Sequence, residues 1–158
     1  MTKIACCIAA VLALVAGQSL SAFAADPHVF VPAPYASAAK VTVLARKGDM
    51  NAEAQLGWMY ATGRGVPQDF YKAAQWYYLA ATKGQGWAQF QLGLLYNKGQ
   101  GVPCNYVLSY MWLNLSASQA VGDDRDFRAR IRDAVATKMT VAQVTQAQGM
   151  AMSWYNTH

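Results

Sequence analysis

Apolar residues recur along this chain every three to four positions, which is the spacing of an amphipathic helix. In the stretch 50–62, for example, Ala52, Leu56, Met59 and Tyr60 fall on one helical face. Glycine, proline and capping residues separate such stretches. The pattern predicts seven helices, at about 37–47, 50–62, 70–83, 86–98, 106–119, 123–138 and from 140 onwards. We therefore expect an all-α fold.

Residues 48–83 recur in altered form as residues 84–119. Thirteen of the 36 positions are identical at this offset, whereas unrelated segments would share roughly two. A period of this length is typical of stacked arrays, in which each unit buries its apolar face against its neighbours. The sequence thus predicts an α-solenoid with a capping helix (37–47), two full repeats (48–83 and 84–119) and a closing helical hairpin (122–158).

Residues that recur inside the helices are expected to pack between them. Gly57 and Gly93 interrupt apolar helical faces, and a glycine there costs about 1 kcal/mol relative to alanine. Close approach of the paired helix would explain both glycines. We expect the recurring aromatic residues to lie in the core as well. They are Tyr60, Tyr96, Trp76 and Trp112.

The first 24 residues have the three-part pattern of a secretory signal peptide. Lys3 precedes an apolar run, and Ala22 and Ala24 supply small residues before the expected cleavage site. The run of 13 residues from Ile4 to Ala16 would reach only about 20 Å as a helix, less than the roughly 30 Å of a bilayer core. We expect export to the periplasm, or alternatively beyond the cell, and no stable membrane insertion after cleavage. Residues 25–36 then form an extended, proline-containing lead-in.

Charge and titratable residues narrow the possible functions. Removing Lys3 with the signal peptide leaves 12 basic and 8 acidic residues, a net charge of +4, which is too diffuse to indicate nucleic-acid binding. The two histidines have no Cys, Asp or Glu at metal-ligand spacing. Asp123, Asp124 and Asp126 lie at a helix start, where they complement the helix dipole. We expect no metal, no cofactor and no catalytic residues.

The repeat carries a recognisable motif. The string Ala-x-x-x-Leu-Gly-x-x-Tyr-x-x-Gly-x-Gly-Val-Pro begins at Ala52 and again at Ala88, and a capping Asp or Asn, an aromatic residue and a Trp follow each copy. This motif resembles the Sel-one-like repeat family, which is related to tetratricopeptide repeats. The resemblance implies a right-handed helical solenoid that acts as a protein-binding adaptor. A cysteine-rich branch of the family resembles β-lactamases, but this chain lacks a cysteine pair in each repeat.

In tetratricopeptide-like stacks, one side of the first helix of each repeat lines a concave groove. By this resemblance, that side holds six candidate partner-binding residues, and its aromatic members are the type that forms interaction hot spots. They are Trp58, Thr62, Trp87, Phe90, Leu94 and Lys98. Packing against a neighbouring helix or against the lead-in is the alternative interpretation.

Three arginines share one face of the helix predicted at 123–138. Arg128 and Arg132 follow Arg125 by three and seven positions. The three side chains could recognise an acidic partner. Alternatively, this face is solvated and balanced by ion pairs such as Asp124–Arg128.

These observations favour a non-catalytic adaptor that binds a protein or peptide of the cell envelope in its groove. Two other hypotheses remain. The protein could be an envelope enzyme or binding protein for a cell-wall compound, such as a muropeptide. It could also be purely structural, with residues 26–36 filling the groove.

Overall fold

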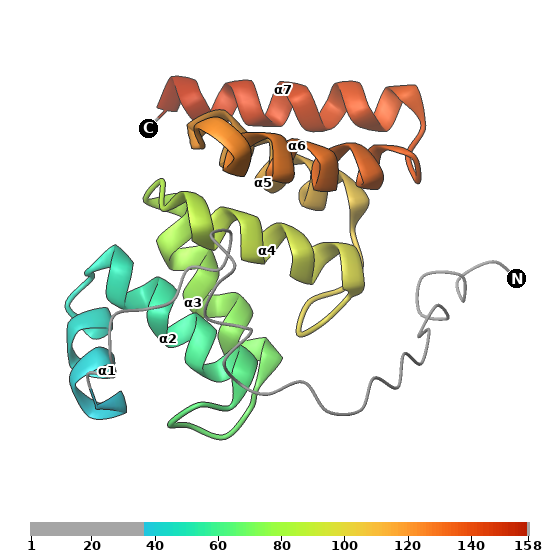
Figure 1. Ribbon diagram of the computed structural model, residues 1–158. Helices are drawn as coiled ribbons and strands as arrows, with labels where there is room; N and C mark the ends of the chain where they lie inside the picture. The colour runs from blue at the N-terminus through green and yellow to red at the C-terminus, as the bar shows by residue number, and fades with distance from the viewer. Residues whose placement is uncertain (1–36, 158) are drawn as a thin grey trace, which may run out of the picture.

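A computed structural model describes residues 37–157, and the predicted signal peptide and lead-in lie outside them. The described residues form seven helices and no strand, stacked from α1 at one end to α7 at the other (Figure 1). The expectation of an all-α solenoid is confirmed. The helices are α1 (Ala38–Arg46), α2 (Met50–Thr62), α3 (Phe70–Thr82), α4 (Gly86–Lys98), α5 (Tyr106–Gln119), α6 (Gly122–Ala136) and α7 (Val141–Thr157).

Short polar side chains fix where the helices of the repeats begin. Asp49 accepts a hydrogen bond from the amide of Ala52 at 2.8 Å, and Asp69 accepts one from Lys72 at 3.0 Å. This bond lowers the pKa of the Asp69 carboxyl below its ordinary value. Asn105 caps α5 in the same way. Such caps satisfy amides that have no partner within the helix, so the repeat boundaries are encoded locally.

The two mid-helix glycines lie where paired helices touch. A Cβ atom added to Gly57 would lie 2.6 Å from Cδ1 of Tyr77 on α3, and one added to Gly93 would lie 2.7 Å from Cγ of Leu113 on α5. Both distances are well below van der Waals contact. The backbone of α2 therefore approaches α3, and that of α4 approaches α5, so closely that a side chain at Gly57 or Gly93 would clash. This close approach is the explanation that we expected for both glycines.

A matched pair of glycine variants tests this packing. We expect Gly57→Ala to destabilise the protein by about 1–3 kcal/mol, because the ring of Tyr77 must move to admit the methyl group. Gly149 lies in α7 with no atom within 4 Å of an added Cβ. Gly149→Ala is therefore expected to stabilise the protein by up to about 1 kcal/mol through helix propensity. Urea melts measure both changes, and equal midpoint shifts in the two variants would contradict the assignment.

Polar contacts at one position of the repeat differ between its two copies. In the first copy, Glu53 is buried at 3 % exposure and its Oε1 lies 2.6 Å from Nζ of Lys83. Thirty-six residues later, the positions hold Gln89 and Gln119, whose side chains share a hydrogen bond of 3.1 Å. An ion pair in the first repeat thus corresponds to a neutral amide pair in the second.

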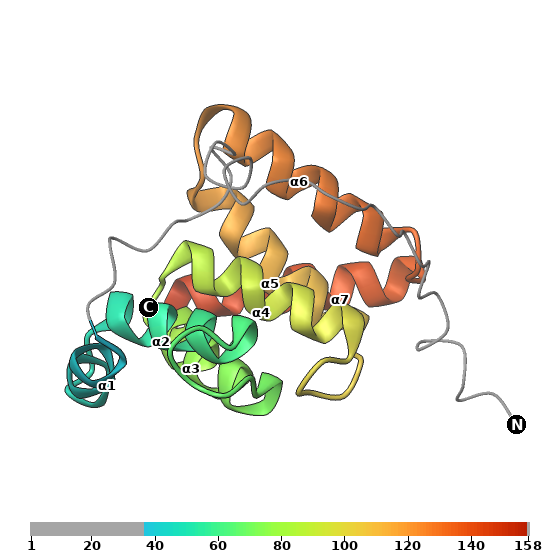
Figure 2. The ribbon, with the colours of Figure 1, turned by 60° about the horizontal axis from the view of Figure 1, so that its bottom comes forward.

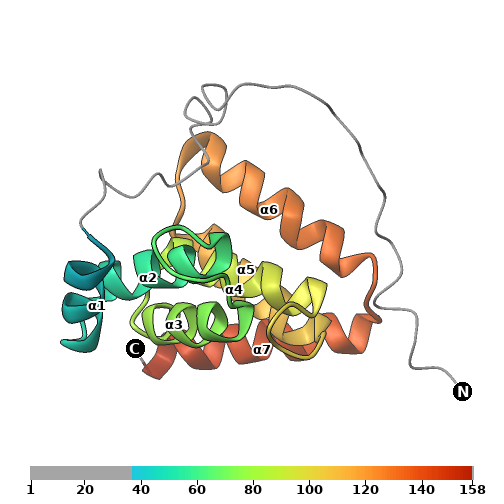
Figure 3. The same ribbon diagram turned by 90° about the horizontal axis from the view of Figure 1, so that it is seen from below.

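The last two helices do not form a packed pair. Both α6 and α7 pack along α5 and make little contact with each other; Figures 2 and 3 show α6 well separated from α7. Ala147 and Ala151 of α7 are buried in the main core. Tyr155, near the end of α7, is 46 % exposed. The array thus closes with α7 covering α5.

Candidate functional site

Two of the aromatic residues expected in the groove belong to the core. Trp87 is 7 % exposed and Phe90 8 % exposed. The ring of Trp87 meets that of Tyr77 edge-on, with centroids 5.5 Å apart, and Phe90 packs against Phe127 at 5.8 Å. The expectation that these two side chains line an open groove is wrong. The first helix of the second repeat packs against α3, α5 and α6, which a spacing argument on one helix cannot show.

The other four groove residues retain some solvent contact. Trp58 and Leu94 are half-buried, whereas Thr62 and Lys98 are exposed. The guanidinium of Arg64 lies 5.1 Å from the centre of the Trp58 ring, a cation–π distance. Thr62 donates to the backbone carbonyl of Trp58 at 2.8 Å. The accessible part of the predicted groove therefore has a single tryptophan, Trp58, and the guanidinium of Arg64 lies over its ring.

Arg128 connects α6 to the rest of the array. Its Nη1 donates to the carbonyl of Gly86 at 3.1 Å and to Oγ of Ser116 at 2.7 Å, and its Nη2 lies 2.6 Å from Asp124. The side chain is only 14 % exposed. This arginine therefore joins three helices and is a poor candidate for steering a partner.

Arg132 and Arg125 differ from each other in how accessible they are to a partner. Arg132 donates to Oδ1 of Asn114 at 3.0 Å and to Asp133 at 2.9 Å, and it lies over the ring of Tyr110. Arg125 is exposed. Both line a cavity of about 400 Å³ between α5 and α6. Of the three predicted arginines, Arg125 keeps the accessibility that recognition of an acidic group requires.

Stability measurements distinguish these roles. We expect Arg128→Ala to lower the free energy of unfolding by about 1–3 kcal/mol, because its buried acceptors lose a charged donor. Arg125→Ala removes an exposed side chain and should change stability by less than about 0.5 kcal/mol. Thermal or urea melts provide the comparison. If the two variants melt alike, Arg128 does not hold α6 in place.

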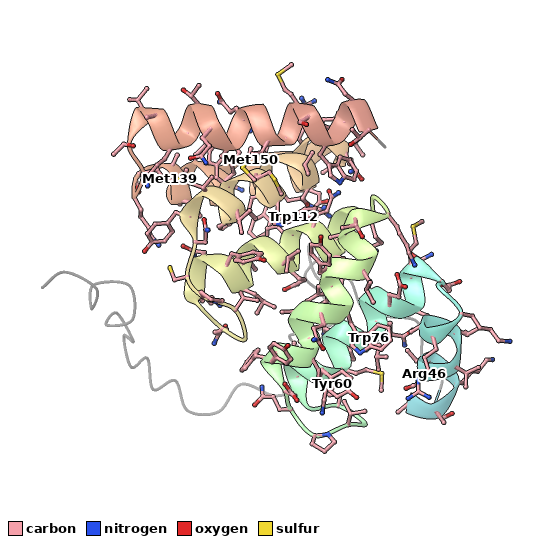
Figure 4. The ribbon with its side chains drawn as sticks, turned by 180° about the vertical axis from the view of Figure 1, so that it is seen from behind. Arg46, Tyr60, Trp76, Trp112, Met139 and Met150 are labelled. Atoms are coloured by element: carbon pink, nitrogen blue, oxygen red, sulfur yellow. The ribbon has the colours of Figure 1, made fainter. Side chains whose placement is uncertain are left out.

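A pocket of about 660 Å³ lies elsewhere, against α3, with α2, α4 and the loop before α5 as its other walls. We call it the aromatic pocket. Figure 4 shows Trp76 near Tyr60, in the part of the molecule next to α1. The residues that line the aromatic pocket are Tyr60, Tyr71, Lys72, Ala74, Gln75, Trp76, Tyr78, Leu79, Leu92, Tyr96 and Val102.

Exposed aromatic and apolar side chains gather around the pocket. Tyr71, Tyr78 and Leu79 are 62 %, 50 % and 42 % exposed. Trp76, Tyr60 and Tyr96 are half-buried. Each packs against a core cluster and also lines the pocket, so the expectation that they lie in the core is met only in part. Only Trp112 of that set is buried, at 4 % exposure. Clustered aromatic residues around a hollow are typical of interaction sites.

Comparison with the second repeat explains why no helix among residues 37–157 covers this face. Leu79 of α3 corresponds by the 36-residue offset to Leu115 of α5, which is fully buried. Gln75 is exposed, but its counterpart Met111 is 6 % exposed. The difference arises because α7 packs along α5. No helix among residues 37–157 packs in the same way along the corresponding face of α3. The sequence carried a signal for this site, since Tyr71, Tyr78 and Leu79 fall on one side of α3 at helical spacing.

Polar groups in the aromatic pocket are suited to binding rather than to proton transfer. Burial, with a smaller contribution from Tyr78, raises the pKa of Tyr96, so its hydroxyl remains a neutral hydrogen-bond donor. The ammonium of Lys72 pairs with Asp69 at 3.2 Å and lies over the Tyr60 ring. Within residues 37–157, no three His, Cys, Asp or Glu side chains gather where they could hold a metal ion.

Comparisons with known proteins agree with this architecture. The family model described as Sel1 repeat matches residues 51–85 and 88–121. The structure of a Sel1 repeat protein from Oxalobacter formigenes is 38% identical, with a TM-score of 0.53, and the match covers 57% of this chain and 68% of that one. The chain belongs to the Sel1 repeat family.

A second Sel1-type structure extends the match. It is a protective antigen present in uropathogenic Escherichia coli strains that displays an SLR fold, 30% identical with a TM-score of 0.70. The match covers 75% of this chain but only 25% of that protein, so this chain spans about a quarter of its length. No curated protein matches the sequence. Sel1 repeat proteins typically act in protein–protein interactions and are generally non-catalytic scaffolds.

Proposed function

We propose that this Sel1 repeat protein is a non-catalytic adaptor of the bacterial envelope that binds a partner protein at the aromatic pocket. The observation that carries the proposal is the exposure of Tyr71, Tyr78 and Leu79 around a pocket of about 660 Å³. Burying such side chains against a partner would remove apolar surface from water, at about 25 cal/mol for each Å².

The place of action is part of the same proposal. Residues 1–24 have the pattern of a secretory signal peptide, which supports export to the periplasm. Among residues 37–157, every helix is too short or too polar to span a bilayer. An acidic partner would also suit the exposed Arg125 beside the α5–α6 cavity, as a secondary contact.

Site-specific photo-crosslinking tests this function in cells. A benzoylphenylalanine at Tyr71 should capture a defined protein, whereas the same group at Val141, which is 84 % exposed on α7, should not. The captured partner is then purified and titrated against the protein. We expect Tyr71→Ala to weaken binding roughly thirtyfold, the usual loss when an aromatic anchor is truncated.

The matched control is Val141→Ala, which removes an exposed apolar side chain away from the aromatic pocket and should leave affinity unchanged. Both variants should keep the melting temperature of the parent protein, because neither side chain is buried. Equal affinity in all three proteins would overturn the assignment of the pocket. In that case the accessible groove residues Trp58, Thr62 and Lys98 become the candidate surface.

A further inference from the structure

We infer that the aromatic pocket is occupied by this chain's own proline-containing lead-in, residues 26–36, which a partner must displace. This inference rests on the proposed function, since it concerns how that same pocket is regulated. It differs from filling of the concave groove, because most of the pocket's lining comes from α3, and Trp58 and Leu94 are not part of that lining.

The position of the first described helix places the lead-in beside the pocket. Ala38, the first residue of α1, packs against the same apolar cluster as Tyr60 and Trp76, which line the pocket. A Cβ added to Gly65 would lie 3.5 Å from Cβ of Ala38, so the start of α1 contacts the loop after α2. The chain before Ser37 therefore joins the described fold next to one end of the aromatic pocket.

The lead-in is long enough to cover the pocket. Eleven residues, 26–36, reach about 34 Å in an extended polyproline II conformation at roughly 3.1 Å per residue. The 13 residues of α3 span about 20 Å. The segment can therefore run from the start of α1 along the whole of α3, past Tyr71 and Tyr78, without strain.

The chemistry of the lead-in also suits the pocket. Its sequence is Asp-Pro-His-Val-Phe-Val-Pro-Ala-Pro-Tyr-Ala. Pro32 and Pro34 restrict Val31 and Ala33 to extended conformations, so less conformational entropy is lost on docking. Grooves lined by aromatic residues recognise such preformed extended segments. Phe30 and Val31 would fill an apolar hollow, and Tyr60, Tyr71 and Tyr78 would supply flat ring faces.

Repeat symmetry supplies an independent reason for an occupant within the chain. On α5, the face corresponding to the pocket is covered by α7, which is part of the same chain. On α3, the residues at equivalent positions are left open among residues 37–157. The lead-in is the segment of this chain outside those residues that joins the fold beside the pocket. It would give α3 the cover that α7 gives α5.

Photo-crosslinking within the exported protein tests the inference. With benzoylphenylalanine in place of Phe30, we expect crosslinks within one molecule to peptides containing residues 71–79 or 96–102, as mapped by mass spectrometry. Leu79→Ser should lower their yield roughly tenfold or more, because an anchoring contact is lost. Val141→Ser, at a similarly exposed apolar position, should not change the yield. A melt of each variant establishes that it is folded.

Other results would overturn the inference. Crosslinks to Trp58 or Leu94 would place the lead-in in the groove, crosslinks between two molecules would make a second copy the occupant, and the absence of crosslinks would leave the pocket open. If one of these occurs while Tyr71→Ala still weakens partner binding, the proposed function stands alone. If Leu79→Ser and Tyr71→Ala affect neither the lead-in nor the partner, both proposals fail.

Discussion

Trp87→Ala is expected to lower the free energy of unfolding by about 3–5 kcal/mol, the cost of removing a large aromatic side chain from a core. Trp87 is 7 % exposed and packs edge-on against Tyr77. Truncation leaves a cavity between α3 and α4, and the close approach of α2 to Tyr77 restricts how far the surroundings can relax to fill it. Urea unfolding, followed by far-ultraviolet circular dichroism, measures the loss.

Trp58→Ala is the matched control for this prediction. Trp58 is half-buried and its ring is covered by the guanidinium of Arg64, so its removal should cost clearly less than the loss of Trp87. The two tryptophans occupy the side of α2 and α4 that a binding groove would use, yet only the first remains accessible. If Trp87→Ala left the urea midpoint unchanged, the ring would lie in an open groove after all.

Lys83→Met is expected to destabilise the protein by about 3 kcal/mol, because it leaves the buried carboxylate of Glu53 without a counter-charge. Breaking a buried ion pair costs roughly 3–5 kcal/mol. The low end applies because Lys83 is 40 % exposed, so only one member of the pair is fully buried. Oε2 of Glu53 already lacks a hydrogen-bond partner among the described residues, so Lys83 supplies the main compensation for the charge.

The second repeat shows how the loss can be repaired. The double variant Glu53→Gln with Lys83→Gln recreates the pair formed by Gln89 and Gln119. Gln89 also donates to the carbonyl of Ala81 at 3.2 Å, and the equivalent acceptor in the first repeat is Ala45. We expect the double variant to lie within about 1 kcal/mol of the parent protein, since neutral replacement of a buried pair is often tolerated.

A double-mutant cycle on Glu53 and Lys83 reports the coupling directly. Each single variant should be less stable than the double variant, in urea melts at one pH and salt concentration. If the double variant is as unstable as the sum of the two singles, the residues do not interact, and the correspondence between the repeats has no energetic meaning.

The candidate binding surface was only partly predictable from the sequence. The pattern on α4 identifies a face that holds Trp87 and Phe90, but it cannot show that Tyr77 and Phe127 cover those rings. Recurrence of Tyr60 and Trp76 at fixed positions correctly indicates that they pack, yet both also line a hollow. Whether a helical face is covered depends on which other helix lies against it, and that is a long-range property.

Local chemistry by itself determined the helices, their boundaries and the stacking period. Caps such as Asp49 and Asn105, the left-handed glycines Gly63 and Gly99, and the 36-residue repeat act over a few residues or between neighbouring units. The tertiary structure alone decided that α7 packs along α5 while no helix among residues 37–157 covers the corresponding face of α3. The physical reason is that the two repeats share a helix–turn–helix backbone, but a face of either repeat is buried only where another helix packs against it. The neighbouring helices differ at the two ends of a finite array.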